Sequence, residues 1–308
     1  MLIRIGTRQS RLARWQADWV ATELRKQGEE VELVLLSTEG DRKDRGALSE
    51  IGSVGVFTRE IQRALLENKV DLAVHSLKDF PTAQAEGTQL AAVPPRGPCE
   101  DVLVTRDQSL LHDLPPKSRI GTGSLRRRSQ LLYLRNDLEV APIRGNVETR
   151  IKKLEDGKYD AIMLARAGLV RLELTEYVHQ IFSVREMIPA VGQAALGLEI
   201  RESDTELHRC LQAMNHRPTH QAVLAERALL SKLQGGCLAP IGAFAFVTDE
   251  NQLQLDAVVL NVSGSQRLFH SCRKPIEDAE ELGRETAEHL LEAGAAALIH
   301  SERSPKQP

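Results

Sequence analysis

The sequence predicts an α/β protein of more than one domain that ends in a smaller α+β region, and three observations support this. Short apolar runs alternate with amphipathic segments through residues 2–165. Prolines and a glycine at residues 94–98 interrupt the alternation, which then restarts. After Pro218 a strongly helical segment precedes residues that alternate as in an antiparallel sheet. A chain of 308 residues is also long for a single core.

The first predicted domain begins with strand–helix–strand alternation. Strands are expected at residues 2–7, 31–37 and 70–76, and helices at residues 12–27 and 57–68. Alternation of this kind is typical of a mostly parallel sheet that is covered by helices.

The second predicted domain repeats the pattern after the proline-rich break. Pro189, Gly192 and Gly197 then indicate a second crossing between domains. The expected strands are residues 101–105, 119–121, 139–142 and 161–165, and the expected helices are residues 125–134 and 147–155.

The C-terminal part has a different pattern. We expect a helix at residues 221–233 that Gly235 and Gly236 close. An antiparallel sheet is expected within residues 241–273, and one last helix spans about residues 279–299.

Composition excludes several classes of function. The formal net charge of −3 argues against general nucleic-acid binding, which needs a positive field. No apolar run is long enough to cross a membrane, and the N-terminal residues lack the pattern of a signal peptide, so a cytoplasmic protein is expected. The four cysteines lie far apart without metal-ligand spacing, which predicts free thiols and no metal site.

Polar residues follow the apolar strand in the segment DLAVHSLKDFP at residues 71–81. Ligands of parallel sheets bind outside the carboxyl ends of the strands, so Ser76, Lys78 and Asp79 are placed for a binding cleft. On these residues alone a simple turn role for Asp79, two residues before Pro81, is the more common case.

The segment GTGSLRRRS at residues 121–129 combines a glycine turn with the start of a helix, which directs backbone N–H groups toward an anion. Thr122 and Ser124 add hydroxyl donors, and Ser124 is a natural N-cap. Arg126 and Arg127 lie in the first helical turn, where the helix dipole disfavours cations, and this indicates a bound anion. A solvated basic face is an equally weighted alternative.

Further arginines recur at strand ends. Arg144 lies in the turn before a helix that contains Arg150, and Arg8 follows the first strand. A guanidinium pairs with a carboxylate through two hydrogen bonds, so arginines at several equivalent positions predict a cleft for a polyanionic ligand.

Cys237 lies in a glycine-containing loop, LQGGCLAPIG, just beyond a predicted helix. The glycines permit the close approach of a bulky group to an accessible thiol. An inert loop cysteine is the more common case, and a thiol hydrolase would need a histidine partner that the sequence does not indicate.

Together these segments resemble the porphobilinogen deaminase family. The most specific are VHSLKD at residues 74–79, GTGSLRR at 121–127, RGNV at 144–147, IPAVGQ at 188–193 and GGCLAPIG at 235–242. The resemblance implies two domains like those of periplasmic binding proteins, joined by a doubly crossed hinge, and a small C-terminal α+β domain. The expected boundaries are residues 1–95 with 195–215, residues 99–190, and residues 217–308.

The resemblance also implies a reaction and a cofactor. Cys237 is expected to hold a dipyrromethane through a thioether. Each porphobilinogen would lose ammonia to give an azafulvene, which the free α-carbon of the terminal pyrrole attacks. After four additions, water would release hydroxymethylbilane. The chain would be a transferase of tetrapyrrole and heme biosynthesis, a cytoplasmic monomer that binds neither membranes nor nucleic acids.

Site residues follow from the positions that match the family. Asp79 matches the catalytic carboxylate. The matching contacts to the carboxylates and other parts of primer and substrate are Arg8, Ser10, Ser76, Lys78, Thr122, Ser124, Arg126, Arg127, Arg144, Arg150, Arg171 and Gln193.

The chain departs from the family pattern in three places. Val54 stands where a lysine is common, and Arg166 where a small or apolar residue is common. Ala194 replaces a usual glycine, a change that is tolerable unless the position needs a positive φ. The main alternative to an enzyme is an anion receptor of the same architecture, since fold does not determine function. The expected lack of a signal peptide and the additional Cys237 domain argue against it.

Overall fold

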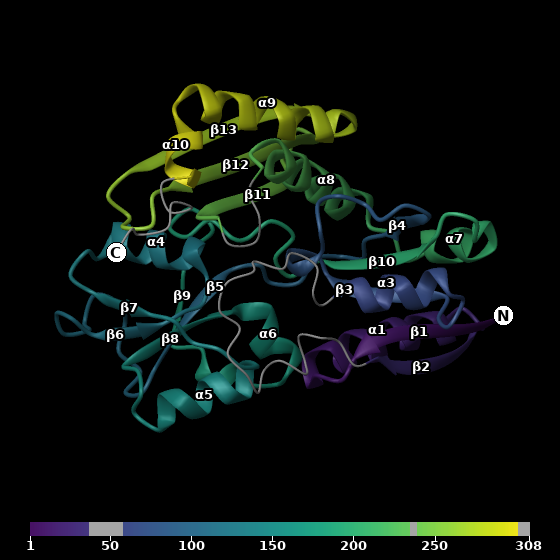
Figure 1. Cartoon of the computed structure of the whole chain (residues 1–308), viewed down its shortest axis with the longest axis horizontal. Helices are drawn as coiled ribbons and strands as arrows, with labels where there is room; N and C mark the ends of the chain where they lie inside the picture. Colours follow the sequence, from purple (N-terminus) through teal and green to yellow (C-terminus); the bar gives the residue numbers. More distant parts are fainter. Residues whose placement is uncertain (37–57, 235–238, 301–308) are drawn as a thin grey trace, which may run out of the picture. The chain divides into compact units, whose positions relative to one another are not determined.

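A computed structural model describes residues 1–36, 58–234 and 239–300. The chain forms two compact units (Figure 1). Unit 1 consists of Met1–Gly97 and Ala194–His220, and unit 2 consists of Pro98–Gln193 and Gln221–Pro308. The chain therefore passes between the units near residues 97, 193 and 220. The first two passages lie at the two breaks in the sequence pattern.

Unit 1 is built on a five-stranded sheet in the order β2-β1-β3-β10-β4. The first three strands are parallel, whereas β10 runs antiparallel to both β3 and β4. Four of the five strands thus run in the same direction, which agrees with the expected mostly parallel sheet, but strands β4 and β10 themselves were not predicted. The elements are β1 Leu2–Arg8, α1 Arg11–Lys26, β2 Glu30–Leu36, α3 Arg59–Leu66, β3 Leu72–Ser76, the 3₁₀ turn η1 Leu77–Asp79, β4 Thr88–Ala92, β10 Leu196–Arg201 and α7 Thr205–Gln212.

Helices cover both faces of this sheet because its strands carry apolar residues on both sides. On one face, α1 and α7 contribute Val20, Leu24 and Leu211 to a core that contains Ile3 and Ile5 of β1. The other face has a separate core, to which α3 contributes Ile61 and Leu65. The sheet is thus fixed on both sides, which gives the C-terminal end of β3 a rigid support.

Unit 2 begins with a second mixed sheet in the order β7-β6-β8-β5-β9. Strands β6, β7 and β8 are parallel, and β5 is antiparallel to β8 and β9. The elements are β5 Asp101–Thr105, β6 Arg119–Gly121, α4 Leu125–Leu134, β7 Glu139–Ala141, α5 Val147–Glu155, β8 Ala161–Ala165, α6 Arg166–Arg171, η2 Thr175–Tyr177 and β9 Gln180–Ile181.

The last part of unit 2 is an antiparallel sheet of β11, β12 and β13, with α9 packed on it (Figure 1). The prediction of one final helix was wrong, because Gly294 has a φ of +98° and separates α9 from α10. The elements are α8 Arg217–Lys232, β11 Ile241–Val247, β12 Gln252–Leu260, β13 Arg267–Pro275, η3 Ile276–Asp278, α9 Ala279–Glu292 and α10 Ala295–His300.

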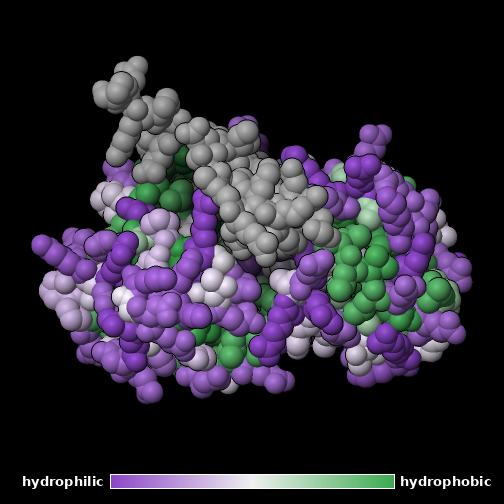
Figure 2. All heavy atoms as spheres, turned by 60° about the horizontal axis from the view of Figure 1, so that its bottom comes forward, coloured by the Kyte–Doolittle hydropathy of each residue, from purple (hydrophilic) through white to green (hydrophobic). Residues whose placement is uncertain are grey.

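One face of the molecule can be described from its hydropathy. Figure 2 shows a mainly hydrophilic face on which apolar residues gather in limited patches. Among the described helices, none is both long and apolar enough to cross a membrane.

Candidate active site

The carboxyl end of β3 presents Asp79 in unit 1. The buried strand ends at Ser76 and continues directly into η1, whose last residue is Asp79. The side chain of Asp79 is exposed, and within the described part of the chain its carboxylate has no hydrogen-bond or ionic partner. Asp79 thus lies in a turn, which the sequence analysis gave as the more common role for this residue. Its carboxylate does not bond to that turn, so it is available to a ligand.

The other predicted residues of unit 1 lie at the same edge of the sheet. β1 and β3 are parallel neighbours, so Arg8 at the end of β1 and Lys78 after β3 belong to that edge. Ser10 caps α1, since its Oγ accepts a hydrogen bond from the backbone N of Ala13 at 3.3 Å.

Ser76 is held by a residue that sequence reasoning missed. Gln16 Nε2 donates to Ser76 Oγ at 2.8 Å, and Ser76 Oγ donates to Gln16 Oε1 at 3.2 Å. Gln16 is buried in α1 on the stripe that also carries Val20 and Leu24. A polar residue at helical spacing on an apolar stripe was the signal that could have revealed it.

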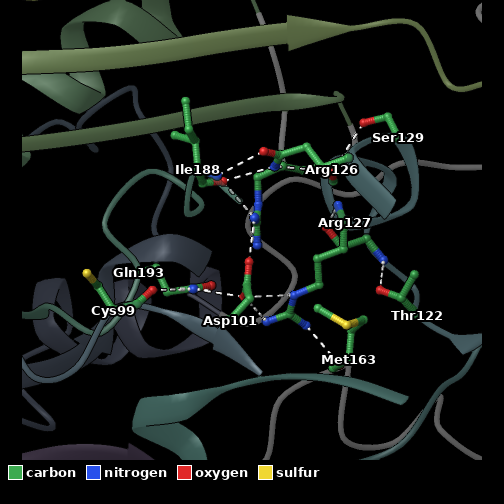
Figure 3. Close-up of polar contacts among 11 residues, drawn as sticks. Cys99, Asp101, Thr122, Arg126, Arg127, Ser129, Met163, Ile188 and Gln193 are labelled. Carbon is green, nitrogen blue, oxygen red and sulfur yellow. Dashed lines mark hydrogen bonds and ion pairs between the residues drawn. The ribbon is translucent and has the colours of Figure 1, made fainter. Parts of the chain in front are cut away.

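In unit 2, Asp101 is the centre of a buried ionic cluster (Figure 3). Arg126 Nη1 donates to Asp101 Oδ2 at 2.6 Å. Arg127 donates to Asp101 Oδ1 through Nε at 3.0 Å and Nη2 at 2.8 Å. Gln193 Nε2 donates to the same oxygen at 2.9 Å. We call these four side chains the Asp101 cluster.

The Asp101 cluster is tied to the backbone carbonyls of three further residues. Arg126 Nη1 donates to the carbonyl of Ile188 at 2.8 Å, and Arg127 Nη1 donates to that of Met163 at 3.1 Å. Gln193 Nε2 donates to the carbonyl of Cys99 at 2.6 Å. The arginines are therefore fixed in orientation, and the alternative of a solvated basic face is wrong, since Arg126 is 3% and Arg127 6% exposed.

The electrostatics of the cluster are unbalanced. Burial alone would raise the pKa of Asp101, but the two guanidinium groups outweigh it and hold that pKa well below its usual range. Burial lowers the pKa of Arg126, and the Asp101 charge opposes this shift. Two guanidiniums face one carboxylate, and among the described residues the buried Arg126 Nε has no hydrogen-bond partner. Because unbalanced buried charge is costly, the cluster suits an anionic ligand.

The N-cap predicted in the glycine turn before α4 is confirmed. Ser124 is the N-cap, and its Oγ accepts a hydrogen bond from the backbone N of Arg127 at 3.4 Å. Thr122 Oγ1 accepts from the backbone N of Ser124 at 3.2 Å. Both hydroxyls therefore shape the turn that presents Arg126 and Arg127.

The remaining predicted arginines of unit 2 lie on α5 and α6 or beside them. Arg144 is exposed in the turn before α5, and Arg150 Nε donates to the carbonyl of Gly145 at 2.7 Å. Arg171 is the last residue of α6, and burial lowers its pKa to about 10.

The departures from the family pattern have different outcomes. Arg166 pairs within the chain, its Nη1 lying 3.0 Å from Glu100 Oε1. Ala194 has a φ of +68°, so this alanine does adopt the conformation that favours glycine. Cys237 and Val54 lie outside the described residues. The free thiols that the sequence predicted are present at Cys99, Cys210 and Cys272.

The fold and the Asp101 cluster define an α/β protein with a buried cationic site suited to carboxylates. Comparison with known proteins is more specific. Residues 3–209 match the model of the porphobilinogen deaminase, dipyrromethane cofactor binding domain, and residues 220–292 match that of the porphobilinogen deaminase, C-terminal domain. The chain belongs to the porphobilinogen deaminase family. It is a transferase (hydroxymethylbilane synthase) of tetrapyrrole biosynthesis, and its cofactor is dipyrromethane.

Relatives support this assignment over nearly the whole chain. Porphobilinogen deaminase from Pelobacter propionicus is 44% identical, and that from Desulforudis audaxviator is 46% identical, each match covering 96% of both chains. Among solved structures, the methionine-binding protein MetQ is 12% identical with a TM-score of 0.45, over 69% of this chain and 89% of that chain.

Proposed function

We propose that Asp79 is the catalytic carboxylate of this enzyme and that Cys237 holds the dipyrromethane. In this proposal the enzyme, a cytoplasmic monomer, condenses four porphobilinogen molecules with loss of ammonia and releases hydroxymethylbilane. The three separate domains that we predicted remain part of the proposal. Distinct hydrophobic cores around Leu103 and around Leu255 support the division of unit 2 into residues 99–190 and 217–308.

The observation that carries the proposal is the excess positive charge of the Asp101 cluster. Dipyrromethane and porphobilinogen carry acetate and propionate groups, and guanidinium groups in excess over carboxylates suit such anions because they pair with them through two hydrogen bonds. Arg127 is held by Asp101 and Met163, so it loses little further freedom when a ligand binds. When bound, the dipyrromethane supplies the pyrrole to which each new unit is added.

The surroundings of Asp79 suit the chemistry of a pyrrole substrate. Positive charge develops on a pyrrole nitrogen during deamination, and a fixed carboxylate stabilises charge where it appears. A carboxylate at that place can also transfer protons when ammonia leaves and when the new ring loses its α-proton. The rigid support by β3 and the absence of a competing partner among the described residues favour Asp79 for both tasks.

Turnover by cysteine variants tests the proposal. Porphobilinogen consumption and hydroxymethylbilane formation are measured for the wild type, Cys237→Ser and the matched controls Cys210→Ser and Cys272→Ser, whose thiols are free. We expect the controls to retain activity and Cys237→Ser to lose it, because a serine oxygen does not replace the thioether sulfur. Full activity of Cys237→Ser would overturn the attachment site.

A further inference from the structure

A buried hydrogen-bond network lies beneath the turn that carries Asp79. At its centre is Glu199 of β10, which is 0% exposed. Glu199 Oε2 lies 2.8 Å from His75 Nε2 of β3. Glu199 Oε1 accepts hydrogen bonds from Gln62 Nε2 of α3 at 2.9 Å and from Thr88 Oγ1 of β4 at 2.7 Å. The carboxylate of Glu199 therefore connects β10, on which it lies, with α3, β3 and β4 of unit 1.

The network satisfies a carboxylate that would otherwise be costly to bury. Burial acts to raise the pKa of Glu199, but the hydrogen bonds from His75, Thr88 and Gln62 outweigh it and lower the pKa. A fully satisfied buried network gives a unique arrangement rather than a range of packings, since any displacement leaves a polar group unpaired.

The His75 ring links this network to the turn that carries Asp79. It packs on the ring of Phe80, with 4.8 Å between the centroids and 34° between the planes. Phe80 directly follows Asp79, and its backbone N donates to the carbonyl of Leu77 at 3.2 Å, which closes η1. The position of the Phe80 ring thus constrains the backbone on which Asp79 lies.

Strand β10 also holds the other end of the turn. The backbone N of Leu77 donates to the carbonyl of Ala195 at 3.0 Å. The side chain of Leu77 fills the space beside Gly197, where a Cβ would lie 2.5 Å from Leu77 Cδ2. β10 therefore supports η1 at both Leu77 and Phe80.

We infer that Glu199 is a positioning residue for Asp79, because it holds the His75 ring against Phe80 and so fixes the turn that presents the carboxylate. This inference rests on the proposed catalytic role of Asp79. A positioning residue of this kind raises kcat without contacting the substrate, since small displacements of a reacting group reduce the rate far more than they reduce binding.

Steady-state kinetics of three variants test the inference, with rates expressed per folded molecule. Glu199→Ala removes the centre of the network. Phe80→Leu removes the ring contact at little cost in volume, so it keeps the test valid if Glu199→Ala does not fold. For both we expect kcat to fall about tenfold or more, with KM changed less than about twofold. The control is Asp71→Asn, which breaks ion pairs to Arg4 and Arg201 at the opposite end of β3 and should leave kcat unchanged.

Two further measurements separate positioning from general destabilisation. Glu199→Gln should restore kcat, because its amide oxygen can accept from Thr88 and Gln62 while its NH₂ donates to His75 Nε2 in the appropriate tautomer. In an Asp79→Glu background, which already displaces the carboxylate, Glu199→Ala should reduce kcat less than in the wild type.

The outcomes distinguish this inference from the proposed function. If Asp79→Ala loses activity while Glu199→Ala and Phe80→Leu keep the wild-type kcat, the positioning role is wrong and the catalytic role stands. If Asp79→Ala keeps the wild-type rate, the catalytic role itself is wrong. Equal losses of kcat in Glu199→Ala and the Asp71→Asn control would also overturn the inference, because they would show an effect of stability alone.

Discussion

Asp79 and Asp101 are acidic residues at the ends of buried strands, yet their surroundings are opposite. Asp79 follows β3, is exposed and has no partner among the described residues. Asp101 begins β5, is fully buried and accepts hydrogen bonds from two arginines and a glutamine. We therefore propose that a strand-end carboxylate without partners, as at Asp79, serves chemistry, and that one held by several partners, as at Asp101, serves structure.

The largest expected effect is on the free energy of unfolding, and it tests the proposed structural role of Asp101. Asp101→Ala would leave two guanidiniums buried against each other without their carboxylate. Breaking a buried ion pair by removing one partner typically lowers the free energy of unfolding by about 3–5 kcal/mol. Denaturant unfolding measures this value, and a loss below about 1 kcal/mol would show that Asp101 does not hold the cluster together.

The second prediction tests the proposed catalytic role of Asp79. Asp79→Ala should lower the turnover of porphobilinogen by about 10²–10³-fold, the usual effect of removing one group that stabilises developing charge. Its free energy of unfolding should change by less than about 0.5 kcal/mol, because the side chain is exposed. Kinetics and unfolding on the same preparation check both values. A stable variant with wild-type turnover would contradict the division between the two aspartates.

The segment that brings Gln193 to the Asp101 cluster offers a smaller test. Ala194 has a φ of +68°, and a left-handed conformation costs a non-glycine residue about 1–2 kcal/mol. We expect Ala194→Gly to raise the free energy of unfolding by roughly 1 kcal/mol, since glycine's greater unfolded-state freedom offsets part of the gain. The control Ala195→Gly, where φ is not positive, should lower it. Destabilisation by Ala194→Gly would show that the alanine is not strained.

Sequence and structure agree best where information is local. The bounds of β5, α4, α5 and β8 were predicted from local sequence patterns alone. The family resemblance implied that residues 195–215 return to the first domain, but the sequence could not predict that β10 pairs with β3 and β4, because that pairing joins segments more than 100 residues apart. The same holds for the sites. Asp79 was placed near a cleft by its position after a strand and given a catalytic role only by the family resemblance. The role of Asp101 depends on Arg126, Arg127 and Gln193, which only the fold brings to it.

A further prediction concerns the pH dependence of stability at a third strand-end aspartate. Asp71 precedes β3, and although burial acts to raise its pKa, hydrogen bonds from Arg4 and Arg201 lower it to about 2. Because the folded pKa lies below the unfolded value of about 3.9, the stabilisation is present above pH ~4 and is lost as the pH falls toward ~2. As the pH is lowered across that interval, the free energy of unfolding should fall more steeply for the wild type than for Asp71→Asn. Parallel curves would show that the ion pairs do not stabilise the fold.

The intact mass of the purified protein under denaturing conditions, compared with that of Cys237→Ser, tests the central claim most directly. The account predicts a covalent increment equal to a dipyrromethane with two acetates and two propionates, present in the wild type and absent from the variant. A wild-type mass that stays unmodified even after incubation with porphobilinogen would contradict it.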